Sequence, residues 1–182
     1  MWRQYSYRPV EVQAEWPSAT VVHVEHQPLA RLGRFVAARP LTMRLRPVIT
    51  AVEPWVRRLT GGRRGLLDLA GLPSLQLTVP GRRSGLLRTV SLLYVPHGPD
   101  TFVLVGSNWG RPEHPSWSAN LNAVADAEIN VGGDVFKVRV RRLTGADRDR
   151  MWRFVTDYWS GYGMEQRLAR NRVFRMYELT RI

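Results

Sequence analysis

Apolar and polar residues alternate in several short stretches of the chain from residue 74 onward, with the period of a half-buried β-strand. The alternation is clearest in residues 74–79. Two other stretches flank Gly132 and Gly133, a glycine pair that favours a tight hairpin turn. The predicted strands are residues 74–79, 88–95, 101–105, 128–131, 134–141 and 173–179.

Helical signals lie between these strands and before the first of them. Residues 115–125 begin with proline, which is favoured in a first helical turn, and the other predicted helices are residues 146–158 and 165–170. The basic and apolar segment 31–59 has apolar residues spaced by three and four in its later part, like one face of a helix. Pro47 and Pro54 predict that this helix is kinked or in two pieces.

The first 28 residues show no sustained period and are interpreted as an extended arm with a short strand at 20–24. His23 and His26 have no third ligand nearby, so no metal site is predicted. Residues 61–65 have the composition of a loop, and residues 66–73 that of a short turn. We therefore expect an arm and basic helical segment over residues 1–60, followed by a barrel-like α+β domain over residues 61–182.

The composition is that of an ordinary globular protein, with 44% hydrophobic and 23% charged residues in a chain of 182. This length is enough to bury a core. The absence of cysteine excludes disulfides, thiolate nucleophiles and zinc-thiolate sites. No apolar run approaches the roughly 20 residues that span a bilayer, and the N-terminus lacks the pattern of a secretory signal. We expect a soluble cytoplasmic protein.

The net charge of +12 and the isoelectric point near 11.3 indicate an anionic partner. Nucleic acid, anionic lipid and an anionic cofactor all satisfy this requirement. The arginines are dispersed and follow no known nucleic-acid-binding module, which disfavours nucleic acid. Residues 41–59 combine an apolar face with arginines, as in helices that lie on membranes. Because such a face more often packs on the domain, we expect it to cover the domain, with at most weak contact with the inner face of the membrane.

Two loops rich in small residues carry the candidate chemistry. In the first, Gly81 and Gly85 allow close approach of a ligand, and Arg82, Arg83 and Arg88 can each grip a phosphate. The second loop lies between Gly106 and Gly110 and contributes neutral donors and flat apolar walls. Its contributing residues, with one from the following helix, are Ser107, Asn108, Trp109 and Trp117.

Taken singly, each loop is more often a plain surface turn. No nucleophile elbow, dinucleotide-binding fingerprint, phosphate-binding P-loop or carboxylate pair occurs in the chain. If the chain is an enzyme, the difficult chemical step therefore belongs to a cofactor. Glycine for approach, arginine for anions and tryptophan for a ring suit a phosphorylated aromatic cofactor.

Both loops resemble the signatures of the deazaflavin (F420)-dependent nitroreductase and F420H2-dependent quinone reductase family. The similarity covers roughly residues 55–182. The first signature corresponds to Gly81, Arg82, Arg83, Ser84, Gly85, Arg88 and Tyr94. The second corresponds to Gly106, Ser107, Gly110, His114, Pro115, Trp117, Asn120 and Leu121.

This resemblance implies a split β-barrel, similar to that of FMN-binding proteins, with inserted and flanking helices. It also implies coenzyme F420 as cofactor and hydride transfer from C5 of the reduced deazaflavin to a quinone or nitroaromatic acceptor. The implied catalytic residues are Ser107, Tyr158 and Tyr162, while Glu165 stands where the family has a further tyrosine. The implied cofactor-binding residues are Arg82, Arg83, Ser84, Arg88, Ser107, Asn108, Trp109, Gly110, Pro115, Trp117 and Asn120.

The sequence also departs from the family pattern, and two other readings stay open. Ser91 stands where the family usually has proline, and Asn108 and Trp109 replace a basic or small pair. A deazaflavin carrier without catalysis would keep the cofactor-binding residues but lack a productive acceptor pocket. A basic nucleic-acid-binding domain is the third reading.

Overall fold

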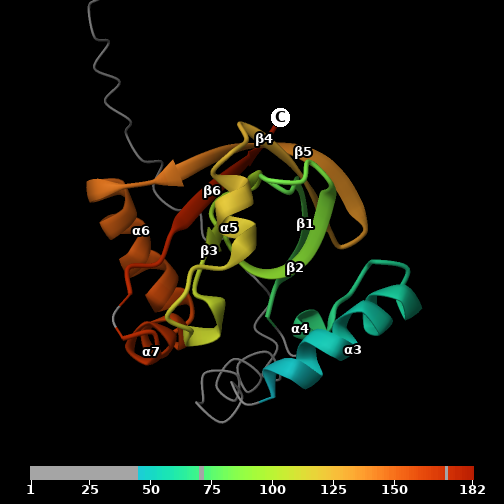
Figure 1. Cartoon of the computed structure of the whole chain (residues 1–182), viewed down its shortest axis with the longest axis horizontal. Coiled ribbons are helices and arrows are strands. Elements are labelled where there is room, and N and C mark those ends of the chain that lie inside the picture. The colour runs from blue at the N-terminus through green and yellow to red at the C-terminus, as the bar shows by residue number, and fades with distance from the viewer. Residues whose placement is uncertain (1–44, 70–71, 171) are drawn as a thin grey trace, which may run out of the picture.

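The computed structural model describes residues 45–69, 72–170 and 172–182 (Figure 1). The predicted arm, the strand at residues 20–24, the two histidines within it and the basic residues up to 44 lie outside these ranges. The division predicted at residue 60 stays a prediction. In the described parts of the chain, every helix is too short or too polar to cross a bilayer.

Six antiparallel strands of the described residues form a closed barrel (Figure 1). Their order around it is β1, β2, β3, β6, β5, β4, and β4 returns to pair with β1. At the closure, Leu77 is opposite Ile129 on one side and Val90 on the other. The strands are β1 Ser74–Pro80, β2 Leu87–Pro96, β3 Thr101–Val105, β4 Asp126–Val131, β5 Asp134–Leu143 and β6 Met176–Arg181. The predicted α+β split barrel is confirmed.

Strand alternation divides the apolar side chains between two cores. In β3, Leu104 belongs to one core, whereas Val103 and Val105 belong to the other. The first core includes Leu77, Ile129 and residues from all six strands, so it fills the barrel. The second lies outside the barrel wall, between the strands and the helices α6 Gly145–Tyr158 and α7 Gly161–Leu168.

Three element bounds differ from the sequence predictions by three residues or more. The helix α5 Ser116–Leu121 ends earlier than predicted because Ala125 already accepts a sheet hydrogen bond from Val140 at 2.8 Å. The helix α7 begins at Gly161, before the predicted start at residue 165. Gly161 is accommodated in its first turn because the Trp159 ring occupies the place where a Cβ would lie. The last strand begins at Met176, which pairs with Val105. The segment before it includes Arg172, whose side chain binds the loop at residues 106–111.

The helix α3 Arg46–Leu59 is unbroken, which corrects the predicted break. Pro47 occupies its first turn, where proline is tolerated, and Pro54 lies within it. The helix packs on the barrel by its polar face, since Glu53 and Arg57 are buried. Its apolar face is exposed and consists of Leu45, Val48, Val52, Trp55 and Leu59. The expectation that this apolar face covers the domain is therefore wrong.

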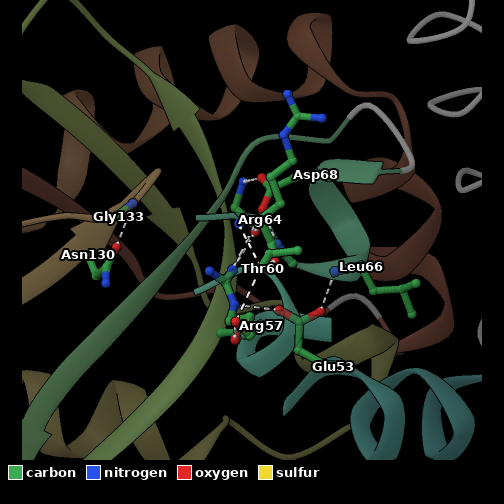
Figure 2. Close-up of polar contacts among 11 residues, drawn as sticks. Glu53, Arg57, Thr60, Arg64, Leu66, Asp68, Asn130 and Gly133 are labelled. Carbon is green, nitrogen blue, oxygen red and sulfur yellow. Dashed lines mark hydrogen bonds and ion pairs between the residues drawn. The ribbon is translucent and has the colours of Figure 1, made fainter. Parts of the chain in front are cut away.

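A buried polar cluster around Arg57 attaches α3 and the short helix α4 Leu66–Leu69 to the barrel (Figure 2). The guanidinium donates to Glu53 at 2.7 Å, to Ser74 of β1 at 2.6 Å and to Ser91 of β2 at 3.0 Å. Asp68 accepts from the backbone and hydroxyl of Ser74, both at 2.7 Å. Because each charge has partners, the cost of its burial is offset. The unusual Ser91 has a clear role here.

Candidate active site

The first loop forms one wall of a pocket of about 500 Å³ at the end of the β1–β2 hairpin. The other wall comes from α5, which lies across one end of the barrel (Figure 1). The residues that line the pocket are Val79, Gly81, Arg82, Arg83, Ser84, Arg88, Thr89, Val90, Ser116, Trp117, Ala119 and Asn120. Six of the eleven predicted cofactor-binding residues therefore meet at one cavity.

The three arginines of this pocket have exposed side chains. Arg82, Arg83 and Arg88 make no ion pair with any carboxylate of the described residues. The backbone below them is tight, because a Cβ at Gly81 would lie 2.8 Å from the Ser84 hydroxyl. Gly85, at φ +68°, donates to the carbonyl of Gly81 at 2.7 Å and closes the turn. Among the described residues, the pocket thus offers three guanidinium groups without an ion pair, two on a compact turn and that of Arg88 at the start of β2.

The opposite wall of the pocket is firmly attached to the barrel through α5. The Tyr177 hydroxyl, buried in the barrel, donates to the Ser118 carbonyl at 2.7 Å and lies 2.9 Å from Oδ1 of Asn122. The ring of Trp117 packs on that of Tyr177, with centroids 5.8 Å apart. Asn120 accepts from the backbone N–H of Arg82 at 3.2 Å and so connects α5 with the first loop.

The second loop has an unusual backbone. The 3₁₀ turn Asn108–Gly110 contains two residues other than glycine in the left-handed region, Asn108 at φ 55° and Trp109 at φ 58°. Gly110 follows at φ +70°. Such conformations cost about 1–3 kcal/mol each and concentrate at functional sites. Here the Asn108 amide holds the turn by donating to the Glu113 carbonyl at 2.9 Å.

Arg172, which the sequence analysis did not single out, clamps this loop from the segment before β6. Its guanidinium donates to the carbonyls of Gly106 at 3.1 Å, Ser107 at 2.8 Å and Arg111 at 3.1 Å. It also lies 2.8 Å from Nδ1 of His114. Burial, followed by the charges of Arg175 and Arg172, lowers the pKa of His114. A neutral imidazole at neutral pH is consistent with its cationic neighbours.

A buried acid and a buried tyrosine lie behind the second loop, on α7. Glu165 is 3% exposed and its Oε2 atom has no hydrogen-bond partner in the described ranges. Burial raises the pKa of this carboxyl to about 7, against the opposing effects of a Ser107 hydrogen bond and the Arg172 charge. Tyr162 is 2% exposed, and its hydroxyl likewise has no partner among the described residues. Burial and then Glu165 raise the pKa of Tyr162 well above its usual value.

The predicted residues therefore fall into two adjoining groups. The pocket gathers Arg82, Arg83, Ser84, Arg88, Trp117 and Asn120. The second loop carries Ser107, Asn108, Trp109 and Gly110. Pro115 is buried beside this loop, with its Cδ 3.7 Å from where a Cβ on Gly106 would lie. Tyr158 and Tyr162 do not line the pocket: Tyr162 lies in the outer core, and Tyr158 packs against that core.

Comparison with known proteins identifies the family to which the chain belongs. The model of the F420H(2)-dependent quinone reductase family matches residues 50–173. The F420H(2)-dependent quinone reductase Rv1261c of Mycobacterium tuberculosis is 38% identical over 104 residues, which are 56% of this chain and 69% of that protein. A solved F420-H2 dependent reductase, FDR-A, matches with 27% identity and a TM-score of 0.52, over 59% of this chain and 93% of its own.

A second solved structure, titled a domain-swapped dimer, matches with 27% identity and a TM-score of 0.53, over 69% of this chain and 97% of its own. The family match extends from within α3 to the segment before β6, and so it includes both loops and the buried acid. The chain belongs to the F420H(2)-dependent quinone reductase family and is an oxidoreductase that uses coenzyme F420.

Proposed function

We propose that this protein transfers a hydride from reduced F420 to a quinone, with the cofactor's phosphodiester held at the first loop and the acceptor beside the second. The observation that carries the proposal is the pocket of about 500 Å³ flanked by Arg82, Arg83 and Arg88, none of which is paired with a carboxylate of the described residues. Free guanidinium groups beside a cavity are suited to an anionic ligand.

The chemistry of the pocket fits coenzyme F420. Its phosphodiester and oligoglutamate tail are anionic, and guanidinium groups bind such oxygens in bidentate fashion. The Ser84 hydroxyl lies directly over Gly81, 2.8 Å from where a Cβ would be, so the backbone and this hydroxyl are both close to any bound group. The apolar face of Trp117 offers a flat surface on the α5 side. We propose Ser84 as a neutral donor and Asn120 as the group that keeps the first loop near α5.

The second loop is suited to hold the deazaflavin ring and its linker. When bound, the cofactor supplies the hydride from C5. Asn108, Trp109 and Gly110 form a fixed turn, and Arg172 binds the backbone carbonyls on either side of it, so little order has to be gained on binding. We propose that Ser107, Tyr158 and Tyr162 face the acceptor. A buried hydroxyl without a described partner, such as that of Tyr162, calls for such an explanation.

We propose quinones as the acceptors, since the family and its Mycobacterium tuberculosis member carry that activity in their names. Nitroaromatic compounds are the comparison class, and steady-state turnover of both with reduced F420 distinguishes them. A carrier protein would bind the cofactor without turning over either acceptor class.

The decisive experiment for the pocket is an F420 titration of Arg83→Ala. Loss of a charge-assisted contact to phosphate should raise Kd about tenfold without affecting folding. The matched control is Arg153→Ala, an equal change of charge at an exposed position on α6. An unchanged Kd for Arg83→Ala, or an equal rise in both variants, would remove the arginine from the site.

We also propose weak peripheral contact with an anionic membrane surface through α3. The exposed apolar face of this helix includes Trp55 at 65% and Leu59 at 86% exposure, and exposed Arg58 lies beside it. Each basic residue near an anionic surface adds roughly 1 kcal/mol, which suffices for reversible attachment. Sedimentation with anionic vesicles at low salt tests this proposal. Binding to neutral vesicles that resists high salt would contradict its electrostatic character.

A further inference from the structure

Three polar groups meet behind the second loop, away from the arginine pocket. The Ser107 side chain lies close enough to the Glu165 carboxyl to lower the pKa of that group. The second carboxyl oxygen and the Tyr162 hydroxyl are both buried without hydrogen-bond partners from the described segments. Glu165 and Tyr162 are three positions apart on α7 and so lie on the same side of the helix. A buried acid beside a hydroxyl of the proposed active loop invites a chemical role.

The packing holds this cluster in place. A Cβ at Gly110 would lie 3.0 Å from the Glu165 carbonyl and 2.9 Å from Cβ of Leu168, so the loop and α7 touch directly. Arg172 fixes the same loop by donating to the Ser107 carbonyl at 2.8 Å. These contacts fix the backbone of the second loop against α7, the helix that carries Glu165.

The surroundings of Glu165 allow it to carry a proton near neutral pH. Burial raises its pKa to about 7, while Ser107 and Arg172 act in the opposite direction. Tyr162, on the same helix, stays protonated because burial, Glu165 and Tyr158 all raise its pKa. Glu165 makes no ion pair within the described ranges. Burial of an unpaired carboxylate costs free energy, and binding a proton removes the charge and therefore this cost.

We propose that Glu165 stores the proton that quinone reduction consumes and delivers it through the Ser107 hydroxyl to the reduced acceptor. This inference rests on the proposed function, because it requires an acceptor at the second loop. It assigns to Glu165 a role behind Ser107, where Glu165 itself does not touch the acceptor.

The step balances in electrons and protons. The hydride brings two electrons and one proton to the quinone, which leaves a hydroquinone monoanion. Its oxygen takes the proton of the Ser107 hydroxyl as that hydroxyl takes the proton of Glu165. The products are a neutral hydroquinone, an intact serine and a Glu165 carboxylate, which regains its proton from solvent. A proton-donating group of this kind contributes typically 10²- to 10⁴-fold to a rate.

The pH dependence of kcat with reduced F420 and a soluble quinone tests the proposal. In the unmodified protein, kcat should fall as pH rises through about 7, because the Glu165 carboxyl loses its proton. Glu165→Gln should lower kcat at least about tenfold and abolish this fall, with KM for the quinone and Kd for F420 little changed. Ser107→Ala should give the same flat profile because it interrupts the proton path, and it should raise the pKa of Glu165 further by removing one of the two opposing effects. Glu128→Gln, on the exposed face of β4, is the matched control.

A second readout needs no cofactor. The infrared band of a protonated carboxylic acid should be present below about pH 6, lost above about pH 8 and missing from Glu165→Gln throughout. If the protein turns over quinones while Glu165→Gln keeps the original kcat and pH profile, the inference is wrong. If the band titrates as expected but Ser107→Ala keeps the original profile, the path through serine is wrong. Absence of turnover by the unmodified protein would instead overturn the proposed function.

Discussion

The two loops of the candidate site differ in how they are built. The first is exposed, cationic and relaxed, with its positive φ angle on a glycine that has open space around it. The second is packed against α7, has two left-handed residues other than glycine, and is clamped by Arg172. Long arginine side chains can follow a flexible charged group, whereas a rigid backbone can position a ring and a reacting atom. Under the proposed function, the first loop recognises the cofactor's charge and the second loop positions its reactive part.

Glycine-to-alanine substitution in each loop should give the largest contrast. A Cβ at Gly110 would meet backbone at 3.0 Å, and its φ of +70° disfavours any side chain. Left-handed strain and overpacking together should cost about 3–5 kcal/mol of unfolding free energy. Gly85→Ala has a similar φ of +68° but open space, and should cost only about 1–2 kcal/mol. Urea denaturation of both variants measures the contrast, and equal losses would show that the loops are equally constrained.

The pH dependence of stability should come from Glu165, which lies on α7 behind the second loop, and not from the first loop. The pKa of Glu165 rises from 4.5 to about 7 on folding, so the folded chain binds more protons between these values. Its contribution is full below about pH 4.5 and is lost as pH rises through 7, an upper limit of about 3 kcal/mol. The difference in Tm between the unmodified protein and Glu165→Gln, followed across this range, measures it. A constant difference would contradict the raised pKa.

Removal of Arg172, which clamps the second loop, and of Arg83 in the first loop should have effects of different size on stability. Arg172→Ala deprives several loop carbonyls of a charged donor and should cost about 2 kcal/mol of unfolding free energy. Arg172→Lys should recover little of this loss, because an ammonium group lacks the planar fork of guanidinium. Arg83→Ala should change stability by less than about 0.5 kcal/mol, as is usual for exposed positions. Thermal denaturation compares the three variants, and a large loss in Arg83→Ala would be the contrary outcome.

The strands and both loops could be predicted from the sequence because alternation and glycine turns are local signals. Arg172 could not, since its acceptors are backbone carbonyls more than sixty residues earlier in the chain, which leave no pattern in side chains. The orientation of α3 was also missed. Its apolar stripe favours burial, yet the satisfied cluster around Arg57 and Ser91 attaches its polar face instead. Glu165 was noticed only as a departure, because its burial depends on how α7 packs.

The closure of the barrel between β1 and β4 has a consequence for the chain in solution. Each described strand has a neighbour on both sides for at least part of its length, so the ring of six strands is closed. An open sheet presents an edge to which another chain can add a strand, a common route to aggregation. In this barrel each of the six strands has two partners, so the exposed edge is limited to short segments such as residues 87–93 of β2, which pair with β1 alone.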